Sequence, residues 1–222
     1  ASLSVFLGPF SIRAAEAVTQ ATPPQLQTLQ EKSLLQRQGE WFVFHTLLRQ
    51  FAAEKLAEFP QSETAVGQHS HYYLQEVADL GEALNGEMPH LAVQRIAGAW
   101  ENVKGAWETA VSRQDFPPML AALVPLSDFC QIRGLYREGL RLFSQAAACL
   151  REAHHLEGLA EVLTQQAAMH VRLADYPQAA ETIQAALPLT ANEWVIARLN
   201  ITWGEVLWRQ GHLREAEKKI EQ

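Results

Sequence analysis

The chain has 222 residues, 48% of them hydrophobic, and its 18 basic and 25 acidic residues give a formal net charge of −7 at pH 7. This composition is typical of an ordinary globular protein, and the net negative charge offers no overall attraction to nucleic acid or to an anionic membrane surface. No apolar run approaches the length needed to cross a bilayer, so we expect no membrane partner.

The first 58 residues alternate between helix-like and strand-like patterns. Proline is tolerated in a first helical turn, and Gly39 supplies the chemistry of a hairpin turn. We expect, in chain order, a helix over 12–20, a helix over 23–35, strands over 35–37 and 41–44, and a helix from His45 to about Glu58. This order is the outline of a winged-helix domain that lacks its first helix, and we assign residues 1–58 to such a partial domain with a small β-hairpin.

The last of these helices has an apolar face. Hydrophobic side chains recur along it at the spacing of a half-buried helix. The residues expected on the buried face are Leu47, Leu48, Phe51, Ala52 and Leu56. We therefore expect the helix to pack against the rest of its domain along this face.

After Pro60 every segment has a helical pattern, and short breaks with Gly, Pro, Asp or Asn separate the segments. The predicted helices cover residues 62–85, 89–111, 117–133, 136–154, 156–174, 177–188, 192–210 and 212–222. Consecutive helices with short links usually pack antiparallel. We therefore expect a mainly α chain, with a second domain over 59–222 built from helix pairs.

Three segments of the second domain superimpose: RGLYREGLRLF (133–143), ADYPQAAETI (174–183) and QGHLREAEKKI (210–220). Each has a small residue, an apolar or aromatic residue, a second small residue and a large apolar residue. The first small residues are Gly134, Ala174 and Gly211, and the apolar or aromatic residues are Tyr136, Tyr176 and Leu213. The second small residues are Gly139, Ala179 and Ala216, and the large apolar residues are Phe143, Ile183 and Ile220. The pattern resembles the tetratricopeptide repeat, in which small residues let paired helices approach. The resemblance implies an α-α superhelix with a concave groove.

The stretch SLLQRQGEWFVFH followed by TLLRQFA resembles the end of the winged-helix domain in STAND-type signal-transduction ATPases, bacterial relatives of the NB-ARC switches. In that family a Met-His-Asp-Leu-Leu-Arg segment closes the domain and helical repeats commonly follow. LSVFLGPFSIRAAEAV (3–18) resembles the middle of the domain, and WENVKGAWETAV (100–111) resembles a helix found early in the repeats. The combination covers nearly the whole chain and implies the regulatory or sensor region of a bacterial transcriptional or signalling regulator.

In the family the nucleotide sits in a separate P-loop domain, and the histidine of the closing motif reaches the β-phosphate of bound ADP. The resemblance carries this nucleotide-sensing role to His45, with Phe44 in place of the methionine and Thr46 in place of the aspartate. An imidazole at a helix start can donate to a phosphate oxygen. No GxxxxGK[ST] motif occurs here. We therefore expect no cofactor in this chain, and ATP or ADP in a nucleotide-binding domain upstream of Ala1, since the chain starts without Met and in mid-pattern.

Other chemistry has little support in the sequence. No GxSxG, HExxH or Cys/His pair occurs, so we expect no enzyme and no catalytic residue. Cys130 and Cys149 lie in helical apolar patterns without zinc spacing, as expected for free thiols in a reducing, cytoplasmic compartment. His69 and His71 point to different faces of a helix, so we expect no metal site.

A winged helix can also bind DNA, and residues 23–35 would form its recognition helix. That segment carries Lys32 beside Glu31 in a domain whose charges cancel, so it has little to hold phosphates. We expect no direct binding of nucleic acid by this fragment.

The register of the tetratricopeptide resemblance places six side chains on the groove: Asp128, Gln131, Thr164, Arg198, Glu205 and Trp208. Their mixed chemistry suits a protein or small-molecule effector. The STAND resemblance implies that the repeats bind this effector and that the winged helix relays the binding to the upstream nucleotide-binding domain. The alternative is a stand-alone tetratricopeptide-like scaffold that presents its groove to protein partners and has no ATPase.

Overall fold

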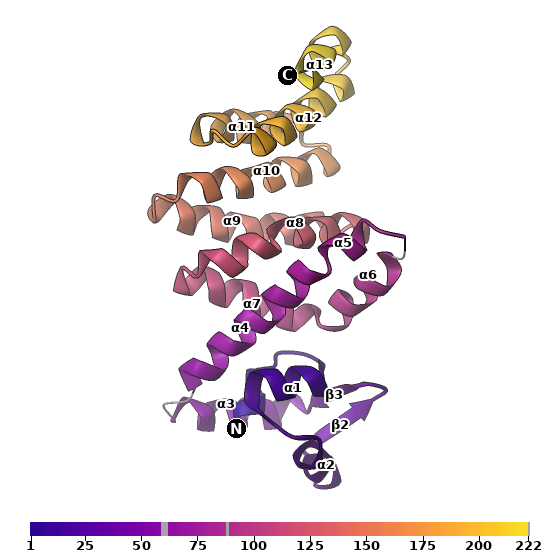
Figure 1. Cartoon of the computed structure of the whole chain (residues 1–222), viewed down its shortest axis with the longest axis vertical. Coiled ribbons are helices and arrows are strands. Elements are labelled where there is room, and N and C mark those ends of the chain that lie inside the picture. Colours follow the sequence, from indigo (N-terminus) through magenta and orange to yellow (C-terminus); the bar gives the residue numbers. More distant parts are fainter. Residues whose placement is uncertain (59–61, 88, 222) are drawn as a thin grey trace. The chain divides into compact units, whose positions relative to one another are not determined.

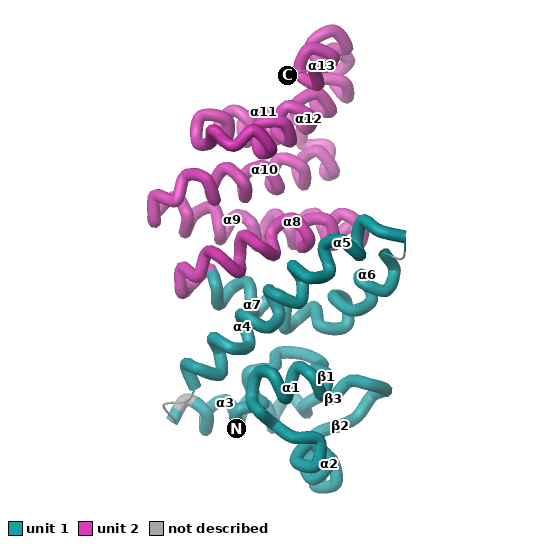
Figure 2. The backbone as a smooth tube through the Cα atoms, viewed as in Figure 1, with its two compact units in different colours: residues 1–110 teal, residues 111–222 magenta. Residues whose placement is uncertain are grey.

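The structure is a computed structural model that describes residues 1–58, 62–87 and 89–221 (Figure 1). Contacts between Cα atoms group the chain into two compact units, Ala1–Ala110 and Val111–Gln222 (Figure 2). The predicted mainly helical class is confirmed, and a small three-stranded antiparallel sheet accompanies the helices. The predicted domain boundary at 58/59 adjoins residues 59–61, which lie outside the described residues, and it stays a prediction.

Unit 1 begins with a small module of helices and strands. Its elements are η1 (Ser2–Val5), β1 (Phe10–Ser11), α1 (Ile12–Thr19), α2 (Pro23–Glu31), β2 (Leu35–Gln38), β3 (Trp41–Phe44) and α3 (Thr46–Ala57). The sheet order is β1-β3-β2, with Phe10 opposite Phe42 and Leu35 opposite Phe44. Helices α1, α2 and α3 and the β2–β3 hairpin were predicted, but α2 ends at Glu31, four residues before the predicted end at Leu35, and η1 was not predicted. Strand β1 was missed because two residues are too few to show an alternating pattern.

Local side-chain chemistry sets where these elements begin and turn. Ser11 caps α1 by accepting a hydrogen bond from the Ala14 N–H at 3.1 Å. Helix α2 opens with two prolines after Thr22, whose N–H donates to the Gln25 side chain at 2.9 Å. Gly39 turns the hairpin with a φ of +64°, which glycine adopts without steric cost. These positions follow directly from the sequence.

Aromatic side chains form the core of this module. Phe6 and Phe10 stack with their ring centroids 4.2 Å apart, and the Phe42 ring lies 6.1 Å from that of Phe10 across the sheet. All three are buried, as are Ala15 and Val18 of α1. Burying large rings contributes strongly to stability, so this stack holds η1, β1 and β3 together.

Helices α4 (Ser62–Asp79), α5 (Gly81–Leu84) and α6 (Pro89–Gly98) follow in unit 1, and α7 (Trp100–Arg113) begins in unit 1 and ends three residues past its boundary at Ala110. The prediction of unbroken helices over 62–85 and 89–111 was wrong. At Leu80 the N–H is shared between two carbonyls of α4, which tightens its last turn. At Gly98 a Cβ atom would lie 2.7 Å from the Trp41 ring. At the second break the Ala99 N–H is likewise shared between the Arg95 and Ile96 carbonyls, directly after a glycine, a residue of low helix propensity.

Unit 2 contains helices that follow one another as packed neighbours. They are α8 (Phe116–Arg133), α9 (Tyr136–Glu152), α10 (Leu156–Arg172), α11 (Tyr176–Ala186), η2 (Leu187–Leu189), α12 (Glu193–Arg209) and α13 (Leu213–Ile220). Helices α9, α11 and α13 each pack on the helix before them, and α10 also contacts α8, α9 and α12. The predicted helices from residue 117 onward are confirmed with ends within two residues, apart from Gln222, which lies outside the described residues.

The first small residue of each repeated segment lies in a left-handed turn just after a helix. The φ angle is +68° at Gly134, +59° at Ala174 and +86° at Gly211. Residues in this conformation let the following N–H groups bond to the last carbonyls of a helix. The recurrence of small residues here is therefore explained by the turn.

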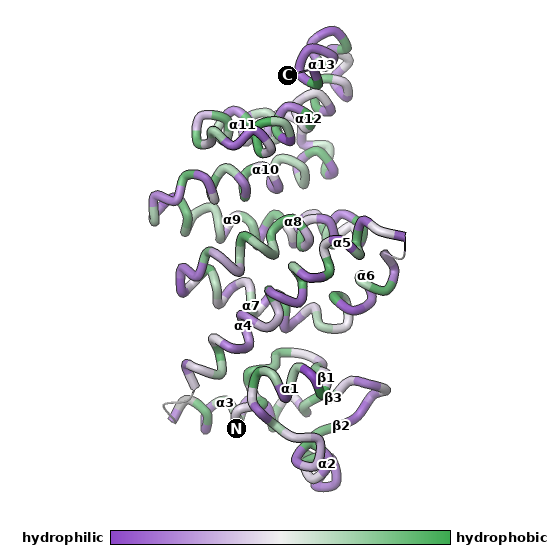
Figure 3. The backbone as a smooth tube through the Cα atoms, in the orientation of Figure 1, coloured by the Kyte–Doolittle hydropathy of each residue, from purple (hydrophilic) through white to green (hydrophobic). Residues whose placement is uncertain are grey.

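The second small residue of each repeated segment is buried against a neighbouring helix. A Cβ atom on Gly139 would lie 3.4 Å from Cys130 Cβ and from Met169 Sδ, and the corresponding residues Ala179 and Ala216 are also buried. The last segment differs in its large apolar position, because Ile220 is exposed on the mostly hydrophilic helix α13 (Figure 3).

Candidate functional site

Arg172, in the last turn of α10, joins side chains from the two neighbouring helices. Its Nε donates to Gln131 Oε1 at 3.2 Å, and its Nη1 lies 3.2 Å from Glu205 Oε1. Arg209 Nη2 lies 3.5 Å from the same Glu205 oxygen, and the Arg209 guanidinium stands 5.0 Å from the centre of the Trp208 ring. We call these five residues the arginine cluster. It brings together three of the predicted groove residues: Gln131, Glu205 and Trp208.

Sequence reasoning missed Arg172 itself. The residue stands 41 positions after Gln131 and 33 before Glu205, which is close to the repeat spacing. Comparing equivalent positions in successive repeats would have identified it. Because the charged groups of the cluster are partly exposed, each ion pair contributes only about 0–1 kcal/mol to stability. The cluster therefore contributes little to the stability of the fold.

A cavity of about 210 Å³ lies between α10 and α12. Its lining includes two further predicted groove residues, Thr164 and Arg198. Arg198 Nη2 donates to Gln165 Oε1 at 3.2 Å. Thr164 is only 2% exposed, and its hydroxyl already donates to the Ala160 carbonyl at 2.8 Å. Arg198 is consequently the better candidate for contact with a ligand.

The rim of this α10–α12 cavity carries an aromatic and an acidic group. Trp194 is almost fully exposed there. Burial, and secondly the nearby Glu157 carboxylate, raise the pKa of Glu161 above its ordinary value. Arg198 lowers that pKa in part, so the cavity presents charges of both signs.

Asp128, the sixth predicted groove residue, is half-buried on α8, one turn before Gln131. The arginine cluster and the α10–α12 cavity hold the other five. What these residues bind stays a prediction.

His45 lies where the sequence predicted, at the start of the helix after the hairpin. It is the N-cap of α3, with φ −64° and ψ 132°, and its carbonyl accepts the Arg49 N–H at 2.9 Å. The imidazole is exposed and makes no capping hydrogen bond. The side chain is therefore free to meet a group approaching the N-terminus of α3.

The predicted buried face of α3 was partly wrong. Leu56 is 6% exposed, but Leu47 is 68% and Phe51 60% exposed, while the remaining two predicted positions are half-buried. The side chains that face the interior are those of Arg49, Ala53 and Leu56, which line a cavity. Apolar spacing identified the helix, but α3 packs mainly on the short η1, so only part of its apolar surface is covered.

No group of three or more His, Cys, Asp or Glu side chains within the described ranges could hold a metal ion. Among the helices of that part of the chain, none is long and apolar enough to span a membrane. Both cysteines are free, and burial raises the pKa of Cys130 to about 12. Cys130 is therefore a poor nucleophile at neutral pH.

Comparisons of the chain with models of known protein families, with curated protein sequences and with solved structures gave no match. The candidate sites are accordingly defined by the residues of this chain and their geometry.

Proposed function

We propose that the chain is the regulatory region of a bacterial, cytoplasmic STAND-type ATPase that controls transcription or signalling. Residues 1–58 would form the partial winged helix and residues 59–222 a tetratricopeptide-like superhelix. The superhelix binds an effector, and the winged helix relays this binding to a nucleotide-binding domain. The observation that carries the proposal is the exposed His45 imidazole at the N-terminus of α3, immediately after the sheet.

Physical chemistry supports a phosphate contact at this position. The first N–H groups of a helix lack intrahelical partners, and the helix dipole favours an anion there. The uncommitted imidazole of His45 adds a hydrogen-bond donor beside those groups. ADP in a separate domain could accept these bonds, so the orientation of α3 would depend on the bound nucleotide.

The β2–β3 hairpin, with α1 and α2 beside it, supports the winged-helix assignment. Helix α2 would correspond to the recognition helix of a DNA-binding relative. Exposed Glu31 directly precedes exposed Lys32 at its end, so the local charge is balanced. We propose a relay role without direct binding of nucleic acid.

The arginine cluster supports an effector that combines acidic and aromatic groups, as a peptide or a small molecule can. Arg172 and Arg209 share the single carboxylate of Glu205, so an incoming carboxylate could replace it. Trp208 is 55% exposed and offers a stacking surface. An effector bound here would act on the nucleotide domain only by preferring one of two domain arrangements.

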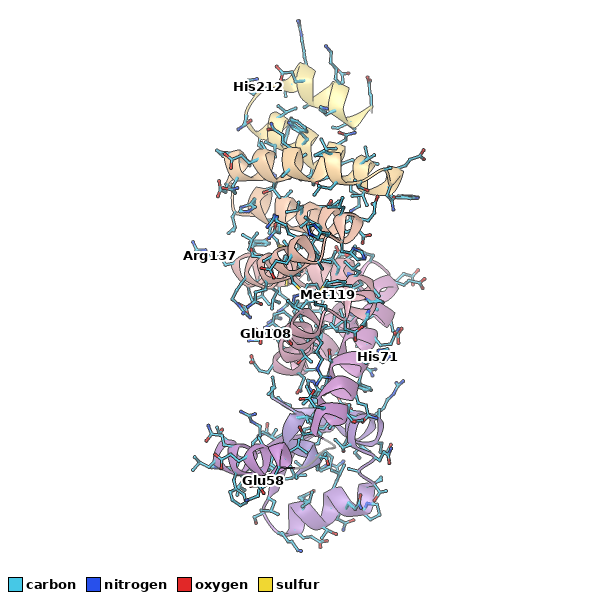
Figure 4. All side chains as sticks on the ribbon, turned by 90° about the vertical axis from the view of Figure 1, so that its left-hand side faces the viewer. Glu58, His71, Glu108, Met119, Arg137 and His212 are labelled. Carbon is cyan, nitrogen blue, oxygen red and sulfur yellow. The ribbon has the colours of Figure 1, made fainter. Side chains whose placement is uncertain are left out.

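The proposal is tested in the protein that carries its natural upstream sequence, by measuring the dissociation rate of ADP. His45→Ala should speed ADP loss at least about tenfold, the effect of losing roughly 1.4 kcal/mol. His71→Ala is the matched control, because it removes an exposed histidine from α4 (Figure 4). Equal ADP dissociation from wild type and His45→Ala would remove His45 from the mechanism.

The arginine cluster also fits the alternative of a stand-alone protein-interaction scaffold, because its contacts need no nucleotide domain. The gene sequence upstream of Ala1 separates the two functions. A P-loop motif within the same reading frame supports the ATPase, and a start codon close to Ala1 supports the scaffold.

A further inference from the structure

Unit 1 contains a cavity of about 310 Å³ bounded by η1, α3, α4 and α7. Its wall is largely apolar and includes Val5, Leu7, Ala53, Leu56 and Val66. Pockets for small ligands have volumes of roughly 300–1,000 Å³. A water-sized group occupies on the order of 30 Å³, so this cavity accommodates about ten non-hydrogen atoms.

The charge on the cavity wall is positive. Arg49 lines the cavity, whereas no Asp or Glu residue is among the described residues that do so. Within the described chain Arg49 forms no ion pair, and it is half-buried in α3. A cation beside an apolar wall, with no carboxylate to balance it, favours an anionic ligand.

Two polar groups on the wall have unused hydrogen-bonding capacity. Ser4 is buried, and its Oγ has no hydrogen-bond partner among the described residues. His69 is also buried, and burial lowers its pKa to about 4, so the ring is neutral at pH 7. Because the His69 Nε2 lies 3.2 Å from Asn102 Oδ1, an acceptor, Nε2 carries the proton. The other ring nitrogen, Nδ1, is then left as an acceptor.

The wall is fixed without a ligand. Asn102 is fully buried, and its Oδ1 accepts the Leu7 N–H at 2.7 Å while its Nδ2 donates to the Pro9 carbonyl at 2.7 Å. The Leu7 side chain then lies directly on Gly105 of α7. A preformed wall lowers the entropic cost of binding.

We propose that this cavity binds a small carboxylic acid with an apolar body, about ten non-hydrogen atoms in all. The carboxylate pairs with Arg49, the body contacts the apolar wall, and Ser4 and His69 offer a donor and an acceptor to polar substituents. This site is separate from the groove and needs no nucleotide domain, so the proposed function can fail while this binding stands.

The test titrates the 222-residue chain with benzoate, phenylacetate, 3-phenylpropionate and hexanoate, and with the matching amides, by calorimetry. At least one acid should bind saturably and about tenfold or more tightly than its amide, since the amide lacks the charge. Amide NMR signals of Val66, Gly105 and Thr109 should shift during that titration.

Four variants locate the binding. Arg49→Gln should lower the affinity for the acid about tenfold and leave the affinity for the amide unchanged. Arg137→Gln is the matched control, because Arg137 extends into solvent from α9 (Figure 4). Ala53→Leu and Val66→Phe fill the cavity from two different helices and should abolish binding, with folding checked by circular dichroism. Absence of saturable binding, equal affinity for acid and amide, or binding that survives both filling variants overturns the proposal.

Discussion

His69 is a histidine that folding keeps neutral. Its pKa falls from 6.5 to about 4 in the folded chain because of burial, which the hydrogen bond to Asn102 only partly offsets. The unfolded chain therefore binds a proton below pH 6.5 that the folded chain does not bind until about pH 4. The contribution of His69 to the free energy of unfolding should be fully present above pH 6.5. It should fall by roughly 2 kcal/mol between pH 7 and pH 5.

Urea unfolding at pH 7 and pH 5 measures this effect. His69→Gln keeps a donor for Asn102 and has no titrating ring, so its loss of stability on acidification should be smaller by that amount. His71→Gln removes an exposed histidine and should behave as wild type. An unchanged pH dependence in His69→Gln would mean that His69 is not the titrating group.

Asn102 is the residue whose side chain does most to hold the segment before β1. It bonds to the Leu7 and Gly8 N–H groups, to the Pro9 carbonyl and to His69. Asn102→Ala leaves several of these part-buried groups without their partner and should destabilise the chain by about 3 kcal/mol.

The control for this substitution is Gln75→Ala, which removes an exposed amide that bonds Asp79 Oδ1 at 2.7 Å. It should change the free energy of unfolding by less than about 0.5 kcal/mol. Similar effects of the two substitutions on urea unfolding would contradict the role assigned to Asn102.

At the scale of elements, the turns between paired helices give a prediction about backbone strain. Ala174 holds a φ of +59° where the equivalent positions Gly134 and Gly211 are glycine, and its side chain is exposed. Ala174→Gly should therefore stabilise the chain by about 1 kcal/mol, because it relieves the strain without losing buried contacts. Gly134→Ala should destabilise it by a similar amount. Thermal unfolding measures both, and a destabilising Ala174→Gly would show that the turn tolerates a Cβ atom without cost.

The helices of unit 2 were the elements that the sequence predicted most closely. Their apolar spacing is regular, and Gly134 and Gly211 end helices by local chemistry that the sequence shows. The break after Gly98 was not predicted, because a single glycine inside a helical pattern does not by itself end a helix.

The candidate site could be predicted from the sequence only in part. A register argument found Gln131, Glu205 and Trp208, but not Arg172, which connects them. Which side chains of α3 are covered could not be read from spacing alone, because coverage depends on what packs against the helix, and Phe51 is exposed.

At the scale of the whole molecule, the proposed function joins three features: the arginine cluster, the partial winged helix and His45. Each feature rests on contacts within its own unit, whereas the function requires that effector binding and nucleotide binding affect each other. An effector at the cluster can alter nucleotide affinity only through a coupling free energy of typically about 1–3 kcal/mol, and bound nucleotide must alter effector affinity by the same factor. Adding ADP to the protein with its upstream sequence should therefore change effector affinity about 5- to 150-fold. Calorimetry with and without nucleotide measures this factor, and an unchanged affinity would show that the groove is not coupled to a nucleotide domain.

The most direct test of the central claim is the nucleotide content of the protein purified with its natural upstream sequence. Denaturing the protein and separating the released small molecules by chromatography identifies and counts them. The proposed function predicts stoichiometric ADP in the wild type and a clear loss in His45→Ala, with His71→Ala unchanged. Purified protein that carries no nucleotide and binds none when ADP is added would contradict it.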